Sequence, residues 1–156
     1  MKGWVQIYTT TCYLQVVVYI CRMAPKKRKS DCPINFALEI FGDKWTFLIV
    51  RDLMFKGNHY YGEFLQMEEK IATNILADRL ALLEISGIVT RTIDEQHNSK
   101  KIYRLSQKGI DLLPLLTEVI LWSAKYDKHS AVDKTFVRQA KKDRQGLFDK
   151  IIESLK

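Results

Sequence analysis

The feature that most constrains the fold is a strongly periodic helix near the middle of the chain. Within residues 73–86, Leu76, Leu80 and Leu83 recur at helical spacing, and Gly87 follows as a C-terminal stop. A helix with one apolar stripe packs that stripe on a core, which leaves its opposite face outward.

Two segments of strand character follow this helix, at residues 88–93 and 101–105. Both are rich in β-branched and aromatic side chains, and the polar run 94–100 joins them. This pattern predicts a β-hairpin with a long tip, and so a mainly α-helical fold with one small hairpin.

Helical spacing and stop signals predict further helices on both sides of this unit. Ser106 can cap a helix that runs to about residue 128, in which Pro114 either introduces a kink or marks the start of a second segment. In the tail, residues 131–156 return to helical spacing with Gly146 as a weak point. Three shorter helices are predicted upstream, at residues 34–41 with Pro33 at its first position, at 44–54 and at 62–67.

This order of elements is that of a winged helix-turn-helix domain. The major groove of DNA admits one α-helix, while a hairpin beside it can reach backbone phosphates or the minor groove. The chain of 156 residues can fill one core but hardly two. We therefore expect one such domain at residues 32–130 and a helical tail at 131–156.

The net charge of +7 does not by itself argue for nucleic acid, because it is unevenly distributed. Residues 31–130 hold 12 Lys and Arg against 14 Asp and Glu. The more useful signal is local, since residues 96–110 contain four basic and no acidic residues. This patch coincides with the second half of the predicted hairpin.

The first 31 residues form two segments of different character. Residues 3–21 carry no charge. We interpret residues 1–22 as an extension that results from a start codon assigned too far upstream, so that the protein would begin at Met23. A weak membrane anchor or an extra strand remain the alternatives. Residues 23–31 form a basic arm around Lys26–Lys29, which resembles a nuclear localisation signal but is also common in DNA-binding proteins.

Signals for catalysis or metal binding are weak. The three cysteines show no disulfide or zinc spacing, and His59, His97 and His129 form no ligand pattern. The sequence has neither a phosphate-binding glycine loop nor a nucleophile elbow. We therefore expect a cytoplasmic protein that is not an enzyme, needs no cofactor or metal and has no membrane partner. The sequence does not identify a small-molecule effector.

At the residue level the chain resembles the HxlR-type regulators, which are relatives of the MarR family. The resemblance covers roughly residues 32–128 and implies a homodimer on a palindromic operator, with helix 73–86 in the major groove. This chain has Ala72 where family members often have Ser, so the helix cap is expected to shift to Thr73. The resemblance rests on Cys32-Pro33, the run at 42–53, Tyr61-Gly62-Glu63-Phe64, Ile75-Leu76 with Arg79-Leu80, and Tyr103-Arg104-Leu105-Ser106 with Lys108-Gly109.

Recognition residues are expected on the helix 73–86. Asn74 is suited to pair with an adenine edge, and Asp78 either accepts from cytosine N4 or forms a salt bridge and contacts no base. Arg79 either holds a phosphate or pairs internally with an acid such as Glu84 or Asp52. The predicted set is Thr73, Asn74, Ala77, Asp78 and Arg79.

The hairpin tip is expected to bind the DNA backbone. Such contacts give affinity without sequence information and weaken with salt, and the alternative is a solvated loop. The predicted contacts are Asn98, Ser99, Lys100 and Lys101, with Lys44, Tyr60 and Tyr61 as further phosphate candidates. Trp45 is assigned to the core.

The helix predicted at 106–128 is apolar over more of its circumference than burial on one face requires. Pairing of two copies across a two-fold axis would cover that surface, and it matches a palindromic site. The alternative is that the tail sandwiches this helix inside the monomer. The predicted interface is Leu112, Leu116, Val119, Ile120 and Trp122.

Cys32 is a candidate redox sensor. A thiol at a helix N-terminus with upstream positive charge has its thiolate favoured, and some proteins that this chain resembles use a cysteine at the matching place to sense electrophiles or oxidants. The alternative role is that of a small structural residue.

For the whole domain, the competing hypothesis is a winged-helix protein-interaction module, whose binding would depend little on salt.

Overall fold

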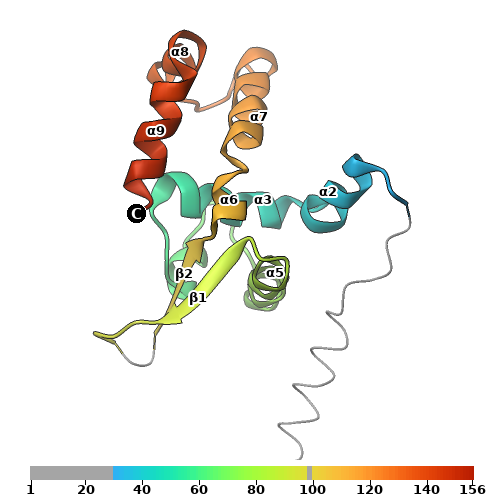
Figure 1. Ribbon diagram of the computed structural model, residues 1–156, viewed down its shortest axis with the longest axis vertical. Coiled ribbons are helices and arrows are strands. Elements are labelled where there is room, and N and C mark those ends of the chain that lie inside the picture. The colour runs from blue at the N-terminus through green and yellow to red at the C-terminus, as the bar shows by residue number, and fades with distance from the viewer. Residues whose placement is uncertain (1–29, 98–99) are drawn as a thin grey trace, which may run out of the picture. The chain divides into compact units, whose positions relative to one another are not determined.

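The computed structural model describes residues 30–97 and 100–156, which fall into two compact units that divide between residues 39 and 40. Our interpretations of residues 1–22 and of the arm at 26–29 lie outside the described residues. Figure 1 shows the elements in order, from α2 to α9.

Helix α2 (Pro33–Phe41) begins as predicted. Pro33 occupies the first helical position, where its missing N–H is not needed, and the Cys32 carbonyl accepts the first helical bond from the Phe36 amide at 3.1 Å.

Helix α3 (Lys44–Arg51) is capped by Asp43, whose carboxylate accepts from the amides of Trp45 at 2.9 Å and Thr46 at 3.2 Å. Trp45 itself is half-buried, so its assignment to the core holds only in part.

The predicted helix 44–54 ends differently from expectation. After Arg51 the chain widens into a π-helical turn, η1 (Asp52–Lys56), closed by Gly57 at φ 70° with its amide donating to the Asp52 carbonyl. The Asp52 side chain is fully buried beside this turn. Its carboxylate accepts from Arg51 Nε at 2.7 Å and Asn58 Nδ2 at 3.0 Å.

Arg51 also forms a bidentate salt bridge with Glu69, and this interaction is expected to weaken at low pH. Hydrogen bonding from Arg51 holds the pKa of Glu69 at about 2, below its ordinary value of 4.5. Because the folded-state pKa is depressed, the stabilisation is present above pH 4.5 and is lost as the pH falls toward 2. We expect Glu69→Gln to lose about 1 kcal/mol at pH 7 and to show a weaker acid dependence of its urea midpoint. Equal acid dependence in both proteins would contradict this assignment.

The next two helices form the helix-turn-helix. Helix α4 (Tyr61–Phe64) is shorter than the predicted 62–67, and Lys70 at φ 52° turns the chain before α5 (Thr73–Ile85). The predicted helix 73–86 is confirmed, and its stripe of Leu76, Leu80 and Leu83 is buried.

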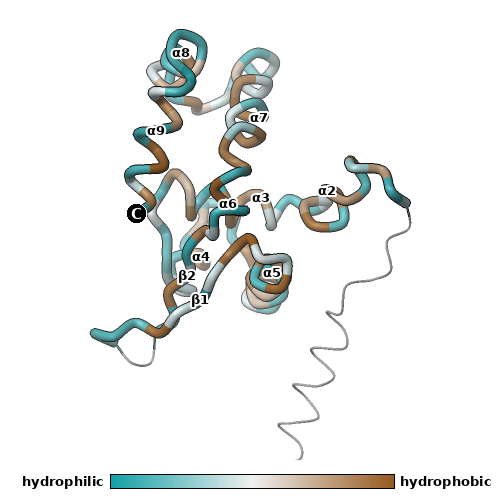
Figure 2. Tube along the Cα trace, in the orientation of Figure 1, coloured by the Kyte–Doolittle hydropathy of each residue, from teal (hydrophilic) through white to brown (hydrophobic). Residues whose placement is uncertain are grey.

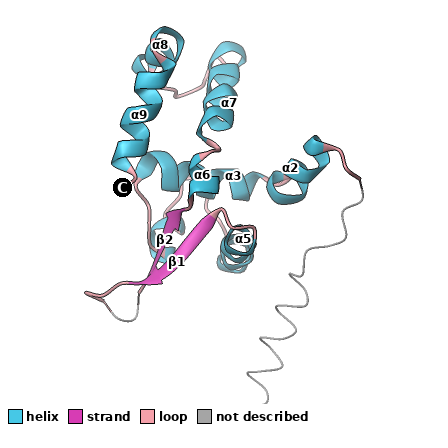
Figure 3. Ribbon diagram, in the orientation of Figure 1, coloured by secondary structure: helices cyan, strands magenta, loops and turns pink. Residues whose placement is uncertain are grey.

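The hairpin consists of β1 (Val89–Ile93) and β2 (Lys101–Leu105), drawn in magenta in Figure 3. The strands are antiparallel and pair Val89 with Leu105 and Ile93 with Lys101. Tyr60 adds a single bridge to Ile102, so the chain before α4 lies along the outer edge of β2. The predicted strand pair is confirmed to within one residue.

The helix predicted at 106–128 is divided into α6 (Gln107–Ile110) and α7 (Leu113–Tyr126). Ser106 caps α6 by accepting from the Gly109 amide at 3.2 Å, and Pro114 lies in the first turn of α7. Of the two alternatives for Pro114, the start of a second segment is correct.

Helix α6 packs directly on the start of the hairpin through Gly109. A β-carbon at this buried glycine would collide with the Ile88 carbonyl oxygen. We expect Gly109→Ala to lower the free energy of unfolding by about 1–3 kcal/mol in urea titrations. Gly62→Ala is the control, because a β-carbon at Gly62 meets open space, and it is expected to be neutral or slightly stabilising. Equal losses in the two variants would exclude the close approach as the cause.

The tail forms α8 (Lys134–Lys142) and α9 (Arg144–Ser154). The break lies at Asp143 and not at the predicted weak point, Gly146. The Gly146 amide donates to the Asp143 carboxylate at 3.0 Å, and a β-carbon at Gly146 would displace that carboxylate. The tail packs on the rest of its unit, with Phe136 edge-on to Phe55 and Arg144 paired to Glu118 at 2.6 Å.

The core of the unit 40–156 lies where α3, η1, α4, α5 and the hairpin meet. Hydrophilic residues mark the hairpin tip and α8 in Figure 2, and these two segments lie at opposite ends of the unit. The most fully buried apolar side chains are Ile49, Val50, Leu53, Phe64, Leu76, Leu83, Ile88, Val89 and Leu113.

Candidate nucleic-acid interface

The outward face of α5 presents polar side chains to solvent. Thr73, Asn74, Ala77 and Asp78 are all exposed, opposite the buried leucine stripe. The expected cap at Thr73 is wrong, since Ala72 is the N-cap and has no side chain to accept a bond. The Thr73 carbonyl instead accepts from the Tyr61 hydroxyl at 2.8 Å, which ties the start of α5 to α4.

Arg79 pairs internally with an acid that we did not predict. Its Nε lies 3.4 Å from Asp43, the residue that caps α3, while Glu84 pairs with Arg91 at 3.2 Å. The Arg79–Asp43 pair joins α5 to α3 and thereby orients the face that carries Asn74. Asp78 is exposed, and no ion pair within the described part of the chain involves it.

The hairpin that follows α5 carries exposed basic side chains. Lys100 and Lys101 are exposed, and so is Arg104, three residues after Lys101 in β2. The predicted contacts Asn98 and Ser99 lie outside the described residues. Because β1 follows α5 directly and packs against it, these cations and the outward face of α5 belong to one unit.

A buried carboxylate anchors the base of the hairpin tip. Asp94 is 7% exposed and accepts from the Tyr60 hydroxyl at 2.8 Å and the Gln96 amide at 2.9 Å. The hydrogen bond from Tyr60 lowers the pKa of Asp94, and the same bond raises the pKa of Tyr60. His97 Nδ1 lies 3.2 Å from Asp94, and Lys100 stands 5.6 Å over the Tyr60 ring. The tip is therefore held to the residue that precedes α4.

We expect Tyr60→Phe to loosen the hairpin tip without unfolding the domain. Loss of one hydrogen bond is expected to speed amide exchange at Gln96 and Lys100 by roughly threefold to tenfold. Hydrogen exchange followed by NMR measures this, with amides in α9 as the internal reference. Unchanged exchange at the tip would show that the bond does not hold it.

The three further phosphate candidates differ in accessibility. Lys44 is exposed at the start of α3, with its ammonium 4.4 Å from the Trp45 ring. The hydroxyls of Tyr60 and Tyr61 both donate within the fold, so their predicted role as phosphate donors is not favoured.

The model of the family described as HxlR-like helix-turn-helix matches residues 40–131, more than half of the chain. The chain belongs to this family.

Several known proteins are similar to this chain in sequence or structure. YdeP of Bacillus subtilis, named an HTH-type transcriptional regulator, is 30% identical over 95 residues, which cover 61% of this chain and 73% of YdeP. The crystal structure of PA1607 is 36% identical with a TM-score of 0.60, over 68% of this chain and 72% of that one. The oxidized form of the redox regulator HypR is 30% identical with a TM-score of 0.55, over 60% and 96%.

The HxlR-like protein is therefore a transcriptional regulator with a winged helix-turn-helix DNA-binding fold, and its family is one of regulators and not of enzymes. The predicted family and fold class are confirmed. No helix within residues 30–97 and 100–156 combines the length and apolarity to cross a membrane.

Helix α7 of this HxlR-like protein keeps one apolar flank exposed. Val119 is 46% exposed and Trp122 65%, and Leu115 and Tyr126, which we did not predict, continue the same flank. Leu112 and Ile120 are half-buried. Leu116 is 5% exposed, so its assignment to a dimer interface is wrong: it packs inside its own chain.

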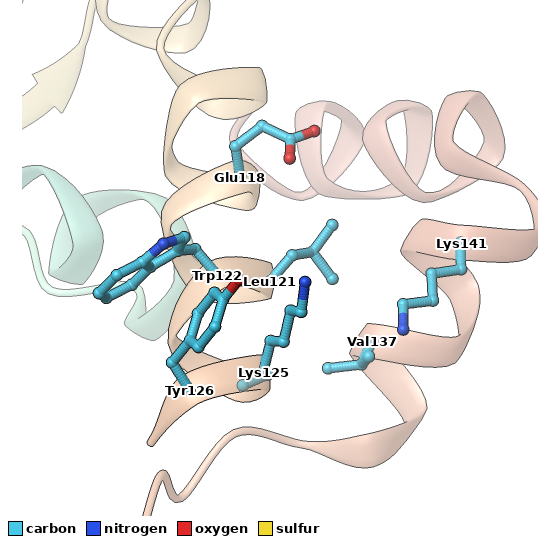
Figure 4. A pocket seen from close by; sticks show the side chains of 8 residues that line it. Glu118, Leu121, Trp122, Lys125, Tyr126, Val137 and Lys141 are labelled. Atoms are coloured by element: carbon cyan, nitrogen blue, oxygen red, sulfur yellow. The ribbon is translucent and has the colours of Figure 1, made fainter.

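Helix α8 of the tail packs on the other flank of α7 (Figure 4), so the alternative in which the tail covers this helix within the monomer is partly met.

Cys32 lies immediately before α2 and is exposed, as a reactive thiol requires.

Two residues that organise the interface escaped the sequence analysis. Asp43 carries the signal of an N-cap four residues before the apolar run at 47–50, but its pairing with Arg79 spans 36 positions. In the sequence Asp94 is only the first residue of a polar run, and it is the fold that brings Tyr60 to it.

Proposed function

We propose that this HxlR-like regulator binds a palindromic operator as a homodimer, with α5 in the major groove and the hairpin on the backbone or in the minor groove. The observation that carries the proposal is the exposed polar face of α5, where Thr73, Asn74 and Asp78 project from a helix whose opposite face is buried. Asn74 is suited to adenine, and Asp78 to cytosine N4. Lys100 and Lys101 supply phosphate contacts from the adjoining hairpin.

The exposed flank of α7 supports the proposed homodimer. Val119 and Trp122, with Leu115 and Tyr126, leave an apolar stripe uncovered in one copy. A two-fold axis beside this stripe covers it twice and presents two α5 helices to successive grooves. We place the protein in the cytoplasm, where its DNA target lies.

A gel shift tests the proposal. DNA flanking the protein's own coding region is titrated at about 50 and about 200 mM salt with wild type, Asn74→Ala and Gln145→Ala, an exposed position on α9. Specific retardation that Asn74→Ala abolishes and Gln145→Ala leaves intact is the expected result. Equal binding by all three proteins would show that α5 does not contact the DNA. Binding of a protein partner that does not depend on salt would favour the protein-interaction hypothesis.

We further propose that Cys32 makes the DNA affinity responsive to oxidants. The exposed thiol before α2 is one support, and the similarity to HypR, a redox regulator, is the other. Treatment with diamide or a quinone is expected to change operator affinity of the wild type but not of Cys32→Ser. An unchanged wild-type affinity would exclude the sensor role.

A further inference from the structure

Ile93 is an exposed apolar side chain in the outer part of the hairpin. It is the last residue of β1 and is 66% exposed, and the residues that follow it at 94–97 are all polar or charged. Among the described residues of the hairpin, at 88–97 and 100–105, no other large apolar side chain is exposed. Covering an aliphatic side chain is favourable in proportion to the apolar area removed from water. Ile93 therefore has apolar area available for a contact outside its own chain.

The register of the hairpin places Ile93 on the face that is turned toward α5. Ile93 pairs with Lys101 across the two strands. The pair two positions earlier in β1, Arg91 with Tyr103, shares this face because residues two apart in a strand point to the same side. On this face Arg91 forms an ion pair with Glu84 of α5 at 3.2 Å. Ile93 and Lys101 continue the same face toward the hairpin tip, so a duplex bound by α5 would pass along them.

The end of β1 is held in place by the residue that follows Ile93. The amide of Asp94 donates to the Lys100 carbonyl at 2.9 Å, and its carboxylate accepts from the Tyr60 hydroxyl at 2.8 Å. A side chain that is already positioned loses less conformational entropy when it makes a contact. Ile93 can therefore meet a partner without reordering of the strand that carries it.

The chemistry of DNA limits what Ile93 can meet. The methyl group of thymine lies in the major groove, which the proposed function assigns to α5. On the backbone and along the minor groove, the apolar surface is the C–H face of the deoxyribose rings. Sugars and phosphates alternate along a strand of DNA. The β-carbons of a directly paired residue pair are about 4.5–5.5 Å apart, so Ile93 and Lys101 are close enough to serve a sugar and the phosphate next to it.

We infer that Ile93 contacts a deoxyribose of the bound DNA while Lys101 binds the neighbouring phosphate. This inference rests on the proposed function, because it takes α5 to lie in the major groove. The two contacts differ in their response to salt. The phosphate contact releases counterions and weakens as salt rises, whereas the apolar contact involves no counterion. Ile93 thus supplies affinity that persists at high salt.

Fluorescence anisotropy with the labelled operator fragment, from about 50 to about 200 mM salt, tests this difference. Ile93→Ala is expected to bind about fivefold more weakly at every salt concentration with an unchanged salt slope, as loss of apolar burial predicts. Lys101→Ala is expected to reduce the salt slope by about one. Ile93→Val keeps most of the apolar area and is expected to keep most of the affinity. Ile85→Ala is the control, because it removes an exposed isoleucine at the C-terminal end of α5, and it is expected to bind like wild type.

Hydroxyl-radical footprinting locates the contact, because the radical attacks the C–H bonds of deoxyribose. Wild type and Ile85→Ala are expected to protect sugars that flank each half-site, and Ile93→Ala is expected to lose this protection. Wild-type affinity in Ile93→Ala, a salt slope that falls as it does in Lys101→Ala, or unchanged protection of the flanking sugars would each overturn the inference.

Asn74→Ala in the same series separates this inference from the proposed function. If Asn74→Ala loses specific binding and Ile93→Ala does not, the placement of α5 stands and the contact of Ile93 is wrong. If Asn74→Ala binds and protects the DNA as wild type does, α5 does not read the major groove, and the inference about Ile93 fails with that placement.

Discussion

Replacing Lys100 and Lys101 together with glutamate is expected to lower DNA affinity by roughly 10- to 100-fold at about 100 mM salt and to reduce the salt slope by about two. Both lysines are exposed on the hairpin, and each is expected to neutralise one phosphate. Fluorescence anisotropy with labelled operator DNA over a range of salt concentrations measures both quantities.

Helix α8 offers a matched control in Lys141 and Lys142, an adjacent pair of exposed lysines at the other end of the unit. Replacing these two with glutamate changes the net charge by the same amount. If the two double variants lose affinity equally, net charge and not the hairpin governs binding, and the phosphate contacts assigned to the hairpin are wrong.

The largest expected effect on stability belongs to Asp52→Ala. The carboxylate of Asp52 is fully buried and accepts from Arg51 Nε and Asn58 Nδ2, so its removal leaves these two N–H groups without their acceptor, while Arg51 keeps its pair with Glu69. A loss of about 3 kcal/mol in the free energy of unfolding is expected from urea denaturation followed by circular dichroism.

Asp149→Ala is the control for this loss, because Asp149 is an exposed carboxylate on α9 that accepts from Gln145. Its cost is expected to stay within about 0.5 kcal/mol. Comparable losses for Asp52→Ala and Asp149→Ala would show that burial of the Asp52 carboxylate does not set its contribution.

Local sequence signals were sufficient for most of the fold. The stripe of Leu76, Leu80 and Leu83 located α5, because period alone shows which face is buried. Ser106 marked the start of α6 because a hydroxyl cap is a local signal. The π-turn at Asp52–Lys56 was not predictable in the same way, since its wider bonding accompanies burial of the Asp52 carboxylate.

The candidate nucleic-acid interface was likewise only partly predictable from the sequence. The outward positions of α5 follow from its period, but the partner of Arg79 does not, since Asp43 lies in another helix. The anchor between Asp94 and Tyr60 likewise depends on how the hairpin folds back on the chain before α4. The assignment of Leu116 failed for a similar reason. In a helix that is apolar on several faces, the sequence pattern does not show which side chains pack inside the chain and which stay exposed.

Footprinting of the operator fragment tests the central claim most directly. Two half-sites on one face of the duplex, separated by about 10 base pairs and with major-groove guanine N7 protected from methylation, are the result that a paired α5 predicts. The protection is expected to vanish with Asn74→Ala. A single protected half-site, or two with the guanine N7 positions still reactive, would contradict the placement of α5 in the major groove of a two-fold complex.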